Sequence, residues 1–131
     1  MKIMICYDGS NVAKDAMDLA KQRAKVLDGQ IYLVRSMEGG PDVPKKDFDN
    51  AERELTELAE TIFKVDGIDC EPHFLVRGLN AGEDLVQFAD EYDVDEIIIG
   101  VRKRSKVGKF LFGSTAQYVI LEAPCPVVSI K

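Results

Sequence analysis

The sequence has no tryptophan, one histidine and three cysteines in 131 residues, and it has no long apolar run. A transmembrane helix needs ~20 consecutive apolar residues, so we expect no membrane contact. The cysteines are odd in number, and together with a single histidine they give no zinc-ligand spacing. Free cysteines are typical of a reducing compartment. The sequence therefore predicts a cytoplasmic protein without a protein-bound metal.

Several catalytic and phosphate-binding motifs are also missing. There is no Gly-x4-Gly-Lys-Ser/Thr run, which excludes a P-loop. The segment Tyr7-Asp-Gly-Ser10 lacks the later glycines of a dinucleotide fingerprint, and residues 74–78 lack the aspartate of a receiver domain. No Ser-x-Gly elbow or Cys–His pair indicates covalent catalysis. We therefore expect no enzyme, with slow ATP hydrolysis as at most a by-product.

Charge and composition indicate which class of protein the sequence encodes. The chain carries 23 acidic and 17 basic residues, a net charge of −6, with 46% apolar and 31% charged residues. These fractions are typical of a globular protein, and the length suits one domain over residues 1–131. An acidic chain is poorly suited to nucleic acid or to an anionic membrane surface.

Apolar runs and amphipathic stretches alternate along the chain. Runs typical of buried strands occur at residues 2–7, 30–36, 70–76, 95–99 and 127–130. Apolar spacings of three and four predict helices at residues 12–27, 47–64, 81–91 and 114–122. We expect Phe74, Leu75 and Val76 to be the most buried part of the third strand. The prolines before the last strand place it at a sheet edge.

This alternation predicts an α/β fold, a parallel sheet between two layers of helices. Right-handed crossovers leave two strand orders, 3-2-1-4-5 and 2-1-3-4-5. We favour 3-2-1-4-5 because it brings the polar ends of the first and fourth strands, Asp8-Gly9-Ser10 and the segment after Gly100, to one crevice. Ligands of open α/β sheets bind where the winding reverses in this way.

The segment from Gly100 to Thr115 is the most unusual in the chain. Five cations lie within eight residues of an acidic protein: Arg102, Lys103, Arg104, Lys106 and Lys109. A helix predicted to begin at Gly113-Ser114-Thr115 would present free N–H groups and two hydroxyls. Glycine, a basic loop and a helix start together favour an anion site, and a phosphate is the natural ligand.

The spacing within this segment resembles the nucleotide loop of the universal stress protein family. That loop reads Gly, two residues, Gly, nine residues and Gly-Ser/Thr; this chain has Gly100, Lys103 in place of the second glycine, then Gly113-Ser114. The opening Ile-Met-Ile-Cys-Tyr-Asp-Gly-Ser and the closing Ala-Pro-Cys-Pro-Val-Val are similar too. The resemblance covers the whole chain.

The resemblance implies a three-layer sandwich of the adenine nucleotide alpha hydrolase-like fold, with a five-stranded parallel sheet of order 3-2-1-4-5. It implies ATP, AMP or ADP as a regulatory ligand in a stress response, Mg²⁺ held through the phosphates, and a homodimer paired through Val127 to Ile130. Carried over by position, the nucleotide-binding residues would be Cys6, Tyr7, Asp8, Val34, Ile99, Gly100, Arg102, Lys103, Gly113, Ser114 and Thr115.

Lys103 is the departure that keeps alternatives open. If its position needs φ > 0, a lysine there costs on the order of 1 kcal/mol or more, yet its charge could bind a phosphate directly. The competing hypothesis is a nucleotide-free, homodimeric interaction module that docks a regulatory protein. In that case Asp8, Ser114 and Thr115 only cap their helices. A third hypothesis, phosphotransfer onto Asp8, predicts an acid-labile phosphate.

Overall fold

The computed structural model describes residues 1–101 and 113–131. Within these ranges five parallel strands form one sheet in the order β3-β2-β1-β4-β5. The strands are β1 (Lys2–Cys6), β2 (Gln30–Ser36), β3 (Cys70–Leu75), β4 (Glu96–Gly100) and β5 (Val127–Ile130). The predicted order is confirmed, and the alternative 2-1-3-4-5 is excluded because β1 pairs directly with β4.

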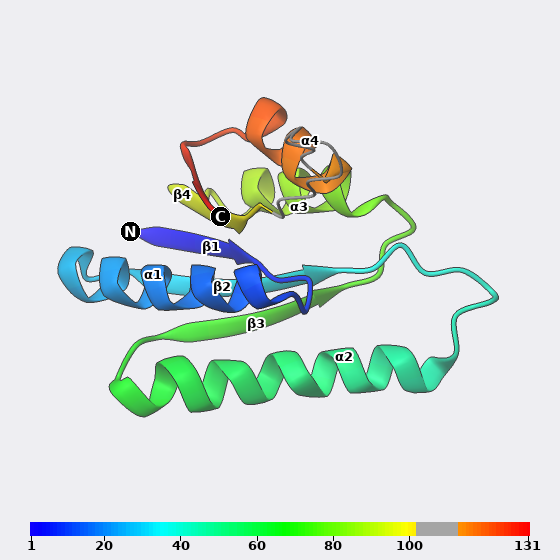
Figure 1. Ribbon diagram of the computed structural model, residues 1–131, viewed down its shortest axis with the longest axis horizontal. Helices are drawn as coiled ribbons and strands as arrows, with labels where there is room; N and C mark the ends of the chain where they lie inside the picture. The colour runs from blue at the N-terminus through cyan, green and yellow to red at the C-terminus, as the bar shows by residue number, and fades with distance from the viewer. Residues whose placement is uncertain (102–112) are drawn as a thin grey trace.

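Helices cover both faces of the sheet (Figure 1). They are α1 (Asn11–Leu27), α2 (Lys45–Leu58), α3 (Ala81–Glu91) and α4 (Ser114–Glu122). Side chains of β1 alternate between the two faces. Ile3 and Ile5 join a buried cluster with α1 and α2, whereas Met4 joins a second cluster with α3 and α4. The chain is a three-layer sandwich, as predicted.

The helix predicted at residues 47–64 is longer and less regular than expected. It begins directly after Pro44, which is its N-cap in an extended conformation, and it continues into a π turn, Ala59–Phe63, and a 3₁₀ turn, Lys64–Asp66. A four-residue repeat drifts by about 40° per step around an α-helix, and a wider π turn reverses that drift. The turn therefore keeps one stripe buried: Ala51, Leu55, Ala59 and Phe63.

The two edge strands differ from each other. β5 lies at one edge, as predicted. β3 lies at the other, and the expectation that Phe74 to Val76 are its most buried residues is wrong. Cys70 is fully buried, whereas Val76 lies beyond the strand and is 43% exposed. Ile31 N–H donates to the Asp69 carbonyl and Met37 N–H to the Leu75 carbonyl. The backbone N–H and C=O groups of the odd-numbered residues of β3 therefore point toward β2, and those of the even-numbered residues point away from it. Pro72 therefore turns its nitrogen, which has no hydrogen, to the outer edge.

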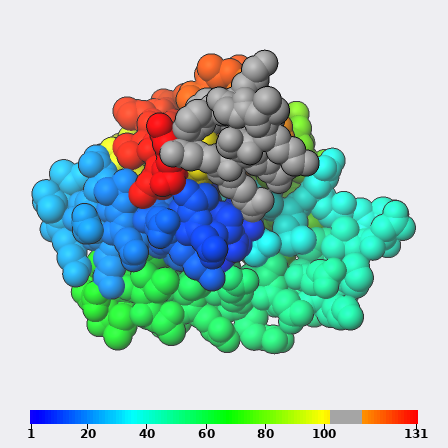
Figure 2. Space-filling view, in the orientation of Figure 1, coloured from blue at the N-terminus to red at the C-terminus, as the bar shows by residue number. Residues whose placement is uncertain are grey.

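The connection between β2 and α2 is a surface loop. Residues 37–44 carry no helix or strand and project beyond the body of the molecule in cyan (Figures 1 and 2). Gly39 and Gly40 both have positive φ, +83° and +132°, which side chains rarely adopt. The loop therefore owes its shape to these two glycines.

The only histidine lies in an aromatic cluster between β3 and α3. The His73 ring centroid is 4.9 Å from Phe88, 5.1 Å from Tyr92 and 5.6 Å from Tyr32. Its Nε2 atom is buried without a hydrogen-bond partner among the described residues. Burial lowers the pKa of His73, with a smaller opposing effect from Glu71. The imidazole is therefore held neutral by its packing.

This environment makes stability depend on pH below neutrality. Because the folded-state pKa lies below the unfolded value of about 6.5, the contribution of His73 is fully present above that value and is lost as pH falls through the folded-state pKa. As pH falls from 7.5 to 5.5, we expect the wild type to lose unfolding free energy relative to the His73→Phe variant. The value for the variant minus the value for the wild type should therefore increase. Urea denaturation at both values measures it; a difference independent of pH would contradict the assignment.

Candidate functional site

The carboxyl ends of β1 and β4 lie side by side, because Cys6 pairs in register with Ile99. From β1 the chain winds to β2 and β3 on one side, and β4 and β5 lie on the other. This reversal is where open α/β sheets bind ligands. We call the ends of these two strands, with the first turn of α4, the β1–β4 site. The first turn belongs to it because Ala116 lies in the same buried cluster as Cys6 and Ile99.

The turn after β1 is fixed by its own side chains. Ser10 N–H donates to the Asp8 carboxylate over 3.0 Å, and Ser10 Oγ accepts from Ala13 N–H over 3.2 Å as the cap of α1. Gly9, with φ of +85°, makes this turn possible. Asp8 is exposed and lies just beyond the end of β1.

Gly100 ends β4 against the first turn of α1. A Cβ atom there would lie 2.8 Å from Val12 Cγ1 and 2.9 Å from the Val12 carbonyl carbon and oxygen. Real Cβ atoms do not approach backbone this closely. The glycine is therefore required for helix–strand packing, whatever it does toward a ligand.

Gly113, unlike Gly100, lies where a side chain would fit among its described neighbours. It is the N-cap of α4, with φ −61° and ψ 148°, a conformation open to any residue, and no side chain in the part of the chain that the structure describes caps the helix. A Cβ would meet nothing within 4 Å among the described residues. Neither backbone nor packing within those residues requires a glycine here. Ser114 is exposed and Thr115 half-buried, and the first turn of any α-helix has N–H groups without partners inside the helix.

Three of the expected site residues form an apolar floor. Cys6, Val34 and Ile99 are buried in the cluster on the α3–α4 face. Burial raises the pKa of the Cys6 thiol to about 12, helped by the charges of Cys125 and Asp8. The thiol therefore stays protonated and unreactive.

Tyr7 points to the opposite face. Its ring lies in the α1–α2 cluster, and its hydroxyl donates to Glu54 of α2. Burial, followed by the hydrogen bond to Glu54, raises the pKa of Tyr7. Its backbone N–H donates to the Val34 carbonyl over 2.9 Å. Only the backbone of Tyr7 belongs to the β1–β4 site. Arg102 and Lys103 lie outside the described residues.

Two charged groups near these strand ends were not expected from the sequence. Arg35 lies at the end of β2, where its guanidinium is 3.5 Å from the point a Cβ of Gly9 would occupy and 5.8 Å from the Tyr7 ring centroid. Its ion pair with Glu54 is long, at 3.9 Å. An arginine inside an otherwise apolar strand was the signal that could have identified it.

The second group is Asp84, which is fully buried in α3. Its carboxylate accepts from Ser36 Oγ over 2.6 Å and from Arg77 Nε over 2.5 Å. Arg77 also donates to the Asp84 carbonyl over 3.2 Å and to Glu91 over 3.1 Å. This network joins the end of β2, the β3–α3 connection and α3.

A sequence model of the universal stress protein family matches residues 1–131. The chain belongs to this family. A Thermus aquaticus protein, described as the universal stress protein in QAH/OAS sulfhydrylase 3'region, is 33% identical over 98% of this chain and 97% of the relative.

Solved structures agree over the whole fold. A universal stress protein from Archaeoglobus fulgidus superposes with a TM-score of 0.86 at 36% identity, covering 100% of this chain and 93% of that one. A complex of the universal stress protein from the same organism with dAMP gives 0.83 at 35% identity, covering 100% and 98%. The fold is therefore the adenine nucleotide alpha hydrolase-like sandwich that the resemblance implied.

No group of three or more histidine, cysteine, aspartate or glutamate side chains in residues 1–101 and 113–131 could hold a metal ion. In the same ranges, no helix combines the length and apolarity that a bilayer crossing requires.

Proposed function

We propose that this protein binds an adenine nucleotide, ATP or AMP, at the β1–β4 site as a regulatory ligand. The observation that carries the proposal is the relative bound to dAMP, which is 35% identical and matches this chain from end to end. The local chemistry supports it. An apolar floor lies beside an exposed carboxylate, Asp8, and a helix start with open donors, from Gly113 to Thr115.

Each part of the site suits one part of the ligand. The side chains of Cys6, Val34 and Ile99 would contact the adenine, and Asp8 would accept hydrogen bonds from the adenine or ribose. The first turn of α4 would bind a phosphate through backbone N–H groups and the hydroxyls of Ser114 and Thr115. Gly100 would line the ribose side, and the backbone of Tyr7 would lie beside Asp8. Arg102 and Lys103 would add charge on the phosphates.

The ligand is proposed to regulate rather than to react. The Cys6 thiol is kept protonated by its raised pKa, so the site offers no activated sulfur nucleophile. Mg²⁺ would be bound through the phosphates. We further propose a cytoplasmic homodimer that pairs through β5, a half-buried edge strand. A nucleotide-free interaction module is the competing function.

Calorimetric titration separates these two functions. Protein stripped of carried-over nucleotide is titrated with Mg-ATP and, separately, with AMP. We expect at least one of the two to bind with a Kd below about 100 μM, close to −5.5 kcal/mol or stronger. Heats equal to dilution for both nucleotides at millimolar concentration would overturn the proposal.

The Gly113→Ser variant localises the phosphate. Serine is a better N-cap than glycine, and its hydroxyl would occupy the N–H groups of the first turn of α4. We expect unfolding stability to stay the same or to rise by a few tenths of a kcal/mol, while nucleotide affinity falls about tenfold, or ~1.4 kcal/mol. Unchanged affinity would show that the phosphate does not bind at this helix start.

A further inference from the structure

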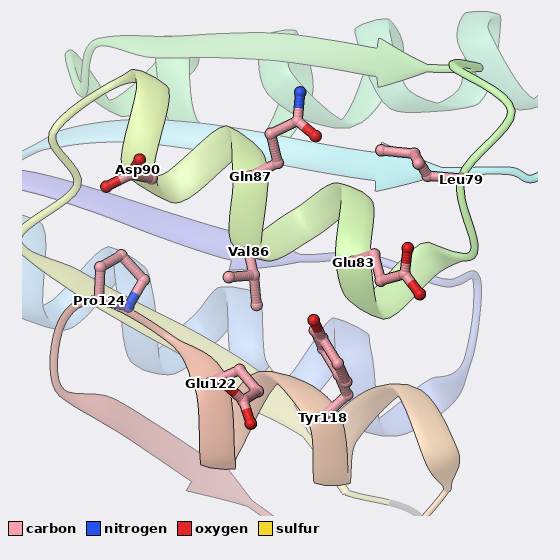
Figure 3. Close-up of a pocket in the computed structure, with 8 residues that line it drawn as sticks. All are labelled: Leu79, Glu83, Val86, Gln87, Asp90, Tyr118, Glu122 and Pro124. Atoms are coloured by element: carbon pink, nitrogen blue, oxygen red, sulfur yellow. The ribbon is translucent and has the colours of Figure 1, made fainter.

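A groove of about 440 Å³ runs between α3 and α4, on the outer side of the helix layer. Figure 3 shows the side chains that line it, from the β3–α3 connection, both helices and the α4–β5 connection. It is separate from the β1–β4 site, since none of the proposed nucleotide-binding residues lines it. Nothing proposed above uses it.

Four of the eight residues that line the groove are apolar or aromatic: Leu79, Val86, Tyr118 and Pro124. Val86 and Leu79 are half-buried, and Tyr118, which rises from α4 toward α3 (Figure 3), is 39% exposed. The helices approach closely because Gly82 faces Tyr118, where a Cβ would lie 3.0 Å from that of the tyrosine. Leu121, on the next turn of α4, is 71% exposed. The surface therefore offers apolar area that the described chain leaves uncovered.

The rim is acidic. Glu83, Asp90 and Glu122 line the groove, and no lysine or arginine of the described residues forms an ion pair with any of them. Within the described residues, the Glu83 carboxylate accepts from one side chain, the neutral amide Asn80 Nδ2, over 2.6 Å. By contrast Glu91, on the same helix, is paired with Arg77. Three carboxylates that have no cationic partner among the described residues, beside apolar side chains, are complementary to a cationic, amphipathic partner.

The spacing of the carboxylates fits a helix. Glu83 and Asp90 are seven positions apart on α3, so they lie on one face about 10 Å apart along the axis, with Val86 between them. We propose that the groove binds an amphipathic helix of a partner protein. Its arginines or lysines at positions i and i+7 pair with Glu83 and Asp90. Its apolar side chains at i+3 and i+4 pack on Val86 and Tyr118, which is the helix-in-groove mode of recognition.

Charge argues against other occupants. A second copy of this chain has a net charge of −6, which disfavours its approach to the acidic groove; the homodimer proposed above uses β5, none of whose residues lines the groove. Nucleic acid and anionic membranes are repelled for the same reason. The proposal does not depend on nucleotide binding.

The test uses a synthetic, amidated peptide of about 18 residues, long enough to form a helix. It has arginine at i and i+7, leucine at i+3 and i+4, and alanine and glutamine elsewhere. Fluorescence anisotropy with the full chain is expected to give a Kd of roughly 10–100 μM, weakening several-fold as salt rises from about 50 to 300 mM. A peptide with glutamate in place of arginine is expected not to bind. Equal binding of the two peptides, or none by either, would overturn the proposal.

Charge-neutralising variants assign the surface. E83Q/D90N/E122Q keeps the shape of the rim and is expected to weaken peptide binding at least tenfold. The matched control D49N/E52Q/E57Q removes the same charge from exposed positions of α2, across the sheet, and should bind like the wild type. If both variants lost peptide affinity equally, the effect would come from net charge alone, and the groove would not be the binding site. Sedimentation velocity forms the last arm: if the groove variant alone changes the oligomeric state, the occupant is a second copy and the proposed partner is wrong.

Discussion

Replacing Gly100 by alanine is expected to lower the free energy of unfolding by about 2–3 kcal/mol, the upper range for overpacking a buried site. The added methyl would lie 2.9 Å from the Val12 carbonyl carbon and oxygen. Backbone atoms inside the first turn of α1 cannot move aside alone, so the capped helix would have to shift against β4. Urea denaturation of the purified variant measures the loss.

Two comparisons make this prediction specific. Gly113→Ala adds the same methyl at the other side of the β1–β4 site, where the described residues leave open space, and should cost less than about 1 kcal/mol. The double variant V12A/G100A removes only the contact with Val12 Cγ1 and keeps both backbone contacts. It should not recover the stability of V12A alone. A Gly100→Ala loss no larger than that of Gly113→Ala would show that the contact relaxes freely.

Replacing Asp84 by alanine is expected to cost about 3 kcal/mol, the range for breaking a buried ion pair. The variant leaves the Ser36 hydroxyl and the Arg77 guanidinium without their shared acceptor. Arg77 is partly exposed, with 30% of its side chain accessible, so water recovers some of its hydrogen bonding. That places the estimate at the lower end of the range. Denaturation at constant pH gives the value.

The matched control removes the other carboxylate from the same arginine. Glu91 is 40% exposed where it pairs with Arg77, and exposed pairs contribute about 0–1 kcal/mol. Glu91→Gln should therefore change stability by less than about 1 kcal/mol. If Asp84→Ala cost no more than Glu91→Gln, the network would be incidental to the fold.

Much of the architecture was predictable because the spacing of apolar residues differs between the strands and the helices of this chain. The near-continuous apolar strands indicated a sheet covered on both faces, and the polar ends after Tyr7 and Gly100 selected the correct strand order. What failed depended on tertiary position. The burial of β3 could not be read from its apolar end, because an edge strand is covered on fewer sides. The π turn that follows α2 keeps the apolar stripe of the helix against the sheet, and nothing in the local sequence indicates where such a turn must occur.

The site was predictable in outline and less so in detail. The alternation of a strand already implies that Cys6 and Tyr7 point to opposite faces, so both side chains could not have met one ligand. Asp84 lies one residue before Leu85 and four before Phe88, on the buried stripe of α3, so helical period alone marked it as an inward charge. The role of Gly100 required the approach of α1, from a distant part of the chain.

The unequal edges of the sheet limit how copies of this chain can assemble. β5 offers an unblocked outer strand, whereas β3 presents Pro72, which cannot donate a hydrogen bond, to the outside. Two copies joined through β5 about a twofold axis would form one continuous sheet that ends in β3 on both sides. Each end would then lack one donor, at Pro72, in the middle of the strand that a further copy would have to pair with. Growth would stop at two, because the first pairing uses the open edge of each copy.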